Sequence, residues 1–327
     1  MATVQTALGP LDAERLGFTL SHEHTMNFAM ARYLPFLFDM EDSLRRAKRL
    51  LALAREGGID SLIDLTTFDL GREVEFIRKV SEASGVNIIC ATGVWRDIPR
   101  IFWMRDPDWV ARFMLHEIEH GIDGSGIKPG VIKLAQDQEH LDSDGRLMDR
   151  IARTVRAAAR VCRDTGVPIS THHWAPLEVG RLQVEIFLEE KVPMHLVCIG
   201  HSADTTDDKY LEDLLQTGCY LSMDRYPGGL NNMPDWKARN ATVKRLIDRG
   251  WAGRLMLGHD YPPPPSWAGQ DPPQDTEPVR YTFVKNVAIP ALIEDGVSEE
   301  QVRMMTVEVP KRFLTGEKPL PRQGREP

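Results

Sequence analysis

The chain alternates between short apolar runs and longer amphipathic stretches. The short runs are bounded by Gly, Pro or polar residues, as buried parallel strands are. There are eight of them, at Phe18–Ser21, Ser61–Leu65, Ile88–Ala91, Gly130–Leu134, Pro168–Thr171, Leu196–Gly200, Tyr220–Met223 and Arg254–Leu257. Helical stretches with apolar residues three or four positions apart lie between most of these runs. They include Asp42–Arg55, Arg72–Ser84, Asp149–Asp164 and Ala238–Asp248. Because strand–helix alternation repeated eight times favours an α/β barrel over an open sheet, we predict a (β/α)₈ TIM barrel.

Two segments depart from this alternation. Pro262–Pro278 is dense in proline, too long for a routine connection, and placed directly after the eighth predicted strand. We therefore expect a large loop on the face that holds the carboxyl ends of the strands. The tail, residues 318–327, is polar and contains proline, and we expect it to fray. No Ser- or Gly-rich linker divides the chain, so we predict a single domain over residues 1–327.

The composition narrows the class of protein. Hydrophobic residues make up 42% and charged residues 27% of the 327 residues, as in an ordinary globular protein. The net charge of −8 argues against nucleic acid as a partner, because binding phosphates needs a basic surface. The first ten residues lack the features of a signal peptide, and no apolar run approaches the roughly 20 residues of a membrane span. We therefore expect a cytoplasmic protein with no membrane partner.

The four cysteines form no CxxC pair, and we interpret them as buried thiols rather than disulfides or ligands.

A pair of histidines ends the first predicted strand. Successive side chains of a strand point to opposite faces, so His22 and His24 share a face and Glu23 points away. Two imidazoles on one face can chelate Zn²⁺, Co²⁺ or Mn²⁺. An isolated HxH pair is weak evidence for a metal site, so the interpretation depends on the residues at the ends of the other strands.

Further ligand types come directly after three other predicted strands. They are His172, His201 and Asp260. Each alone could cap a helix or bond a loop carbonyl, but ligand types at four strand ends favour a metal site, since these ends meet at one rim of a barrel. Five ligands also exceed the needs of one four-coordinate ion, which indicates two metals.

Two neighbouring cations need an anionic bridge, and the fourth predicted strand carries Lys133 in place of a carboxylate. A lysine that extends to the barrel mouth is the ordinary interpretation. Carboxylation by CO₂ would instead turn the amine into a carbamate with two oxygens, able to bridge both ions. A lysine at this position allows carboxylation but does not by itself decide between the two interpretations.

Seven motifs spread over nearly the whole chain carry a family resemblance. They are GFTLSHEH (17–24), DLTTFDLGRE (64–73), ATGVW (91–95), GVIKLA (130–135), CIGHSADTTDD (198–208), SMDRY (222–226) and LMLGHDY (255–261). From about Val4 to Leu314 the chain resembles the phosphotriesterase family of the amidohydrolase superfamily. The resemblance implies that Lys133 is carboxylated and bridges the metals. It also implies that His22, His24 and Asp260 bind the more buried ion, and that His172 and His201 bind the more exposed one. His172 is chosen over His173 because the family places its ligand directly after the threonine, and His259 is interpreted as a neighbour and not a ligand.

The resemblance suggests a mechanism. A hydroxide shared by the metals would be the nucleophile, because the ions lower the pKa of bound water from about 15.7 toward neutrality. Asp260 can accept its proton and deliver it to the leaving group. Asp204 matches a carboxylate that continues this proton path in related enzymes, but Arg225 stands where phosphotriesterases carry His. A guanidinium cannot relay a proton, so we interpret Arg225 as a substrate-side cation, with a structural salt bridge as the alternative.

The same motifs bear on the substrate. Asp224-Arg225-Tyr226 and His259-Asp260-Tyr261 resemble the phosphotriesterase-like lactonases, which often place an aromatic residue where Trp267 stands. GVW resembles instead the phosphotriesterase loop, whose tryptophan flanks the leaving-group pocket. We therefore expect Trp95, Leu70, Trp267 and Arg225 at the substrate site, in a mostly apolar pocket; for Trp95 the alternative is simple packing.

These observations predict a binuclear metal hydrolase. We expect a lactonase or esterase with weaker organophosphate triesterase activity, acting on a small-molecule lactone, ester or phosphotriester. A dedicated phosphotriesterase (aryldialkylphosphatase) or a carboxylic esterase is the alternative, and a non-catalytic binding protein is a more remote one, since no metal ligand is missing. Zn²⁺ is the first choice of metal, and Co²⁺, Mn²⁺ or Fe²⁺ also suit the ligands. Relatives commonly form homodimers, so we expect one here.

Overall fold

Eight parallel strands form a nearly closed barrel. The computed structural model describes residues 2–229, 232–273 and 280–323. The barrel strands are β3 (Thr19–Glu23), β4 (Ser61–Asp64), β5 (Asn87–Gly93), β6 (Val131–Gln136), β7 (Ile169–His173), β8 (Val197–Ile199), β9 (Tyr220–Met223) and β10 (Leu255–Leu257). They pair in chain order, so each strand lies beside the next. Two hydrogen bonds link the first and last strands, from Ser21 Oγ to the Leu257 carbonyl (2.9 Å) and from Asp260 N to the His22 carbonyl (2.8 Å). The predicted barrel and all eight predicted strands are confirmed.

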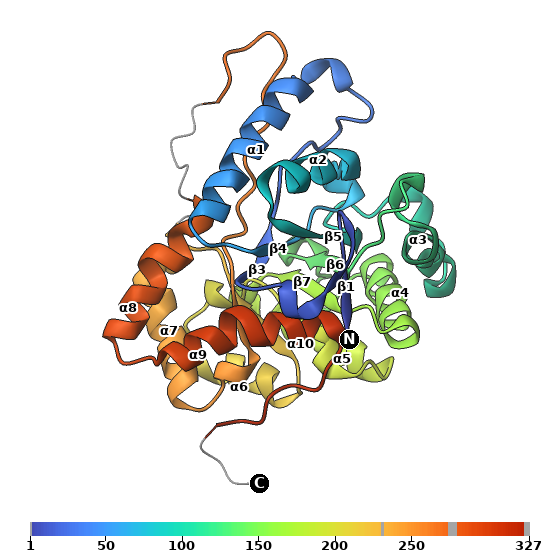
Figure 1. Ribbon diagram of the computed structural model, residues 1–327. Helices are drawn as coiled ribbons and strands as arrows, with labels where there is room; N and C mark the ends of the chain where they lie inside the picture. The colour runs from blue at the N-terminus through green and yellow to red at the C-terminus, as the bar shows by residue number, and fades with distance from the viewer. Residues whose placement is uncertain (1, 230–231, 274–279, 324–327) are drawn as a thin grey trace.

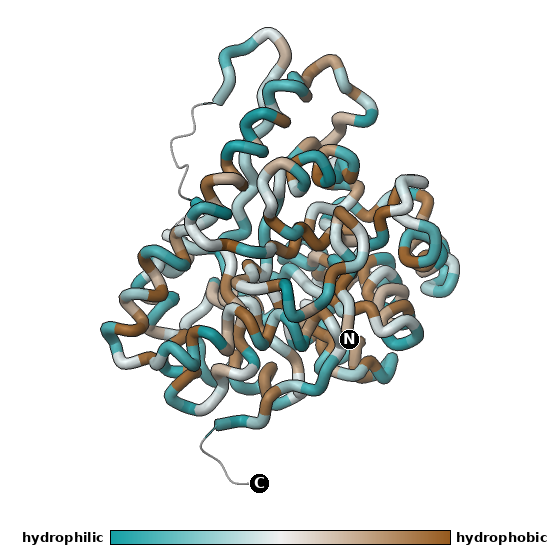
Figure 2. Tube along the Cα trace, viewed as in Figure 1, coloured by the Kyte–Doolittle hydropathy of each residue, from teal (hydrophilic) through white to brown (hydrophobic). Residues whose placement is uncertain are grey.

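Helices surround the barrel, as Figure 1 shows. Their bounds are α1 (Met40–Glu56), α2 (Val74–Ser84), α3 (Pro107–His120), α4 (Asp149–Thr165), α5 (Val179–Glu189), α6 (Asp208–Gln216), α7 (Trp236–Asp248), α8 (Ile289–Glu294), α9 (Glu299–Arg303) and α10 (Val309–Thr315). Four of them start at an aspartate whose carboxylate accepts a backbone N–H of the first turn, at Asp39, Asp106, Asp207 and Asp235. Hydrophobic and hydrophilic positions alternate along the longer helices in Figure 2, and the buried residues of α2, α4 and α5 are mostly apolar.

An N-terminal hairpin was not predicted from the sequence. Strands β1 (Thr3–Thr6) and β2 (Gly9–Asp12) pair antiparallel, and Ala7 N donates to the Ile88 carbonyl at the amino-terminal side of the barrel (2.8 Å). Val4 and Leu11 are buried in a cluster with barrel residues such as Ile89. The hairpin therefore covers the end of the barrel opposite the carboxyl ends of the strands.

The Pro-rich segment after β10 runs back along the start of α1. Arg46 Nη1 donates to the Pro264 carbonyl (2.7 Å), and Asp39 N donates to the Ser266 carbonyl (2.9 Å). In Figure 1 this segment lies beside α1. The described part, residues 262–273, is thus fixed to a helix; residues 274–278 of the predicted loop lie outside the described residues.

Two described residues of the C-terminal tail contact the turn after α7. Arg322 Nε donates to the Arg249 carbonyl (2.9 Å), its guanidinium lies over the Trp251 ring (4.1 Å), and Gln323 N donates to the Gly250 carbonyl (3.1 Å). These contacts fix residues 318–323 to the turn after α7, and residues 324–327 lie outside the described part of the chain.

Among the described residues, no helix is both long and apolar enough to cross a membrane.

Candidate metal centre

His22 of β3 and His24, which follows this strand, lie beside Lys133 and Asp260 inside the barrel mouth. His22 Nε2 lies 3.0 Å from Lys133 Nζ, and His24 Nε2 lies 3.2 Å from Asp260 Oδ1. His22, His24 and Asp260 each offer a ligand atom, and these atoms all lie within 4.8 Å of one another. The structure therefore brings together residues from β3, β6 and the end of β10, as the sequence predicts.

Lys133 occupies the interior of this group. Its side chain is 1% exposed, and burial lowers its pKa to about 8. Gly93, at the same register on β5, allows the strands to approach, because a Cβ there would collide with the Lys133 carbonyl. A lower pKa increases the fraction of neutral amine, which is the form that reacts with CO₂.

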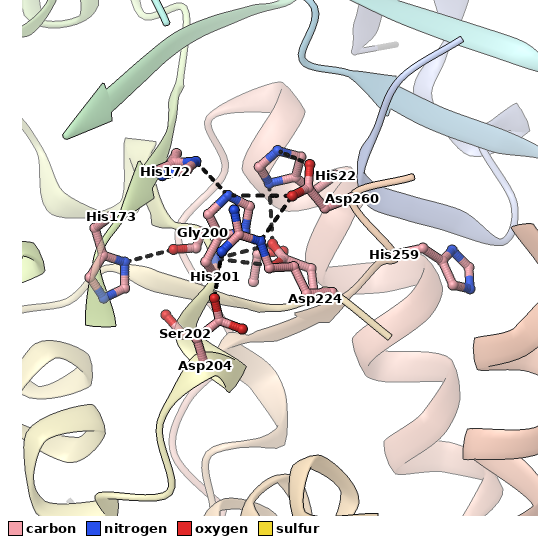
Figure 3. Close-up of polar contacts among 12 residues, drawn as sticks. His22, His172, His173, Gly200, His201, Ser202, Asp204, Asp224, His259 and Asp260 are labelled. Carbon is pink, nitrogen blue, oxygen red and sulfur yellow. Dashed lines mark hydrogen bonds and ion pairs between the residues drawn. The ribbon is translucent and has the colours of Figure 1, made fainter. Parts of the chain in front are cut away.

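His172 and His201 form the second half of the centre. His172 Nδ1 lies 2.8 Å from His201 Nε2, a contact drawn as a dashed line in Figure 3, and the two rings are nearly perpendicular. Burial lowers the pKa of His172 to about 3 and holds the pKa of His201 well below its ordinary value. Both imidazoles are therefore neutral at pH 7, which is the form that ligates metals.

His173 points out of the barrel. Its Nδ1 donates to the Gly200 carbonyl (2.6 Å), and its Nε2 lies 2.9 Å from the Tyr210 hydroxyl. Both ring nitrogens are occupied by protein groups between β7 and the outer helices. The geometry thus agrees with the choice of His172 at the site.

Asp224 is a buried carboxylate beside these histidines that the sequence pattern did not single out. Its Oδ1 lies 2.7 Å from His201 Nδ1, and its Oδ2 lies 3.2 Å from His22 Nδ1. Burial would raise the pKa of Asp224, but His22 and neighbouring donors outweigh it and lower that pKa to about 2. The ionised carboxylate therefore accepts a hydrogen bond from Nδ1–H of each ring and turns both Nε2 atoms toward the site. The available signal was a carboxylate directly after β9, in the SMDRY motif.

The backbone is left-handed at three of the strand ends. His201, Arg225 and Asp260 have φ values of 61°, 64° and 50°, in a region that residues other than glycine rarely adopt. Such a conformation persists only where surrounding contacts hold it. For Asp260 these contacts include Glu23, which accepts from His259 N (2.8 Å) and Tyr261 N (3.3 Å) on either side of it.

His259 lies outside the group of ligands. Its Nδ1 lies 2.7 Å from Glu23 Oε1, and its Nε2 accepts from Val284 N (3.0 Å). Figure 3 shows its ring turned away from His22 and Asp260. Glu23, which was expected to point away from the site, thus fixes the segment that carries Asp260.

Arg225 connects the two acidic residues that the sequence singled out. Its Nε donates to Asp260 Oδ2 (2.9 Å), and its Nη1 donates to Asp204 Oδ2 (2.6 Å). Burial would raise the pKa of Asp260, but His201, His22 and Arg225 hold that pKa well below its ordinary value. Arg225 is 26% exposed, so it both pairs with carboxylates and borders open space.

Two adjoining cavities open at the centre. An inner cavity of about 240 Å³ is lined by Leu70 and Trp95 together with the predicted ligands. An outer cavity of about 370 Å³ is lined by Trp95, Asp204 and Arg225, and it carries more charge than the sequence indicated.

Trp267 does not line either of these two cavities. It stacks on Phe38 (ring centroids 5.0 Å apart), is 40% exposed, and lines a separate hollow with Pro262–Pro265. Its spacing from Asp260 suggested the substrate channel, but the loop packs on the start of α1.

Comparison with known proteins decides the family. The model of the phosphotriesterase family matches residues 2–314. The chain belongs to the phosphotriesterase family. It is 36% identical to the phosphotriesterase homology protein of Mycobacterium tuberculosis, over 96% of this chain and 98% of that protein. It is 32% identical to the aryldialkylphosphatase of Saccharolobus solfataricus, over 93% and 97% of the two chains. It is 26% identical to the N-acetyltaurine hydrolase of Mus musculus, over 95% and 97%.

A solved structure shares the family fold. The phosphotriesterase from Mycobacterium tuberculosis superposes with a TM-score of 0.85 at 34% identity, covering 97% of this chain and 99% of that one. The resemblance of the sequence to the phosphotriesterase family is therefore confirmed, and family membership indicates a hydrolase.

The side chains fit the metal centre of a phosphotriesterase-family protein. Each of the four histidines has one ring nitrogen held by a protein group and the other turned inward. The outer partners are Asp224 for His22 and His201, Thr66 for His24, and Asp137 for His172. Imidazoles fixed from behind in this way are typical of metal ligands.

Proposed function

We propose that this protein is a binuclear metal-dependent hydrolase that cleaves lactones or carboxylic esters and hydrolyses organophosphate triesters more slowly. The main support is that the inward nitrogen atoms of four histidines surround Lys133 and Asp260 at the barrel mouth. A centre with this many neutral and anionic donors suits two cations better than one.

The donors divide into two groups. His22, His24 and Asp260 would hold the more buried ion. His172 and His201 would hold the more exposed ion, and carboxylated Lys133 would contribute to both sites. When bound, two divalent cations lower the pKa of bound water and polarise the carbonyl or phosphoryl oxygen under attack. Zn²⁺ is our first choice, while Co²⁺, Mn²⁺ and Fe²⁺ suit the same ligands.

Asp260 is the residue that we assign to proton transfer. Arg225 Nε holds its Oδ2, which leaves Oδ1 directed at His22 and His24. The ionised carboxylate can accept a proton from the attacking water and return it to the leaving group. Arg225 keeps its own proton at working pH. No proton therefore passes through it to Asp204, and this outer carboxylate serves to position Arg225.

The inner cavity would hold the reacting group. Leu70 and Trp95 form its apolar wall, and Arg225 faces it from β9. The Trp95 ring lies edge-on to His172, with centroids 6.5 Å apart, so a substrate that packs against Trp95 in the cavity would be close to the metal ligands. We assign these three residues to substrate binding, and we place Trp267 only at the outer approach.

A dedicated phosphotriesterase is the second candidate. One relative is named aryldialkylphosphatase, and Trp95 lies in a loop that resembles those of phosphotriesterases. A carboxylic esterase is the other alternative, because it would use the same hydrolytic chemistry. A non-catalytic binding protein is disfavoured, because all six predicted ligands are present and meet.

We also propose a homodimer. Tyr33, Phe36 and Met104 are large apolar side chains exposed on the loops before α1 and α3. Contiguous apolar patches mark surfaces that associate, and we propose that a second copy of the chain covers these side chains. Light scattering at micromolar concentration should give twice the mass of one chain.

A parallel hydrolysis assay tests the reaction. The metal-loaded protein should be given γ- and δ-lactones, an aryl ester and an aryl phosphotriester, with Asp260→Asn as the inactive control. We expect kcat/KM for the best lactone to exceed that for the phosphotriester by orders of magnitude. The reverse order would overturn the lactonase assignment in favour of the second candidate, and hydrolysis of none of these substrates would overturn both.

A further inference from the structure

The outer cavity gathers charged side chains from separate parts of the chain. It is lined by four arginines, Arg96, Arg225, Arg239 and Arg280, and by three carboxylates, Asp137, Asp204 and Asp260. The arginines come from the end of β5, the end of β9, helix α7 and the segment before α8. Since guanidinium groups repel one another, four around a cavity of about 370 Å³ indicate a binding role beyond packing.

Two of these arginines are held in place by aromatic rings. The Arg96 guanidinium lies over the Trp95 ring at 5.2 Å, and the Arg280 guanidinium lies over the Tyr261 ring at 5.4 Å. Arg96 also pairs with Asp137 (3.1 Å) and with Glu139, and it remains 37% exposed. A stacked guanidinium loses little conformational freedom when it binds an anion.

The other two arginines share one carboxylate. Asp204 accepts from Arg225 Nη1 (2.6 Å) and from Arg239 Nη2 (2.8 Å). The buried Nε of Arg239 has no hydrogen-bond partner within the part of the chain that the structure describes. Gly228 lies directly against this atom, and a Cβ at that position would collide with it. Among the described residues, this Nε is therefore a buried donor without an acceptor beside the cavity.

The outer cavity is continuous with the inner one. Both are lined by Trp95, His172, Arg225, Asp260 and Pro262. A ligand can therefore place one end beside Asp260 and the other among the arginines. The combined space is of the size that holds small organic molecules.

We infer that the substrate carries an oxyanion, such as a carboxylate, sulfonate or phosphate monoester, at a distance from the bond that is cleaved, and that Arg96 and Arg280 bind this group in the outer cavity. The inference rests on the proposed hydrolase function and specifies its substrate class. Arg225 and Arg239 add positive charge behind the site while remaining paired with Asp204. Planar guanidinium groups match the geometry of such oxyanions.

Calorimetric binding to the metal-loaded, full-length protein tests this inference. The probe is 1-butanesulfonate, because a sulfonate is a poor metal ligand, and the neutral control is butanesulfonamide. We expect the sulfonate to bind at least tenfold more tightly, since hydrogen bonds to a charged group are stronger than those to a neutral one. Pentanoate and butyl phosphate, measured in the same way, rank the three oxyanions.

Variants locate the anion. Arg280→Gln should weaken sulfonate binding about tenfold, Arg280→Lys should lose less because it keeps the charge but not the planar fork, and Arg96→Gln should repeat the tenfold loss. Arg15→Gln, on an exposed residue outside the site, is the matched control and should change nothing. Equal binding of sulfonate and sulfonamide, or equal affinities in Arg280→Gln and Arg15→Gln, would overturn the inference. If the inference fails in this way but the protein still hydrolyses neutral lactones, the proposed function stands. If the protein binds the anion but hydrolyses none of the substrates, the proposed function is overturned.

Discussion

Arg225 Nε lies 2.9 Å from Asp260 Oδ2, so the residue after β9 holds the carboxylate after β10. Both residues have left-handed backbone conformations, which direct their side chains toward each other across the strand ends. Arg225 thereby fixes the group that we assign to proton transfer while bordering both cavities. This double contact makes it the residue most suited to influence substrate choice.

Replacing Arg225 by histidine should shift the substrate preference. Arg225→His removes a fixed charge and introduces a group that can exchange protons with Asp260 and Asp204. We expect the ratio of kcat/KM for lactone to that for phosphotriester to fall by about tenfold, equivalent to about 1.4 kcal/mol. Steady-state kinetics on both substrates give this ratio, with Arg105→His on the exterior as the control. An unchanged ratio would mean that Arg225 is only a structural ion-pair partner.

Asp224 should couple the two halves of the metal centre. Its carboxylate contacts Nδ1 of His22 in one half and Nδ1 of His201 in the other. Asp224→Asn should therefore weaken the binding of both ions about 10- to 100-fold, as is usual for groups that orient a ligand. Asp137→Asn is the matched comparison, because Asp137 contacts only His172 among the predicted ligands. Metal titration would contradict this role if the Asp224 variant lost only one ion.

The two adjacent histidines of β7 test which face of this strand is turned toward the metals. His172→Asn should lose the more exposed ion. His173→Asn should keep both ions but lose about 1–3 kcal/mol of folding stability, because it leaves the Tyr210 hydroxyl and the Gly200 carbonyl without their partner. Elemental analysis and urea denaturation separate the two outcomes. Metal loss in the His173 variant, with retention in the His172 variant, would reverse the assignment.

Much of the fold and of the ligand set could be predicted from local pattern. The strands are short β-rich runs, and each predicted ligand lies at or just after the end of one, which places it at the barrel mouth. His172 could be distinguished from His173 only through the family motif, because both end the same strand.

The remaining features depend on contacts between distant positions. Asp224 contacts His22 across 202 positions, and Glu23 contacts His259 across 236, so nothing in the neighbouring sequence indicates either pair. Trp267 was predicted at the substrate site from its spacing to Asp260. The loop instead runs along α1, because Ser266 and Pro264 bond to residues near the start of that helix.

The central claim is that Lys133 joins the two halves of the metal centre. Elemental analysis of the purified protein and of Lys133→Ala, each loaded with Zn²⁺ in the presence of bicarbonate, tests it most directly. We expect two ions per chain in the parent protein. The variant should lose metal and most activity, with partial recovery of both when a short carboxylic acid is added to replace the carbamate. Two ions and full activity in Lys133→Ala without any added acid would contradict the account.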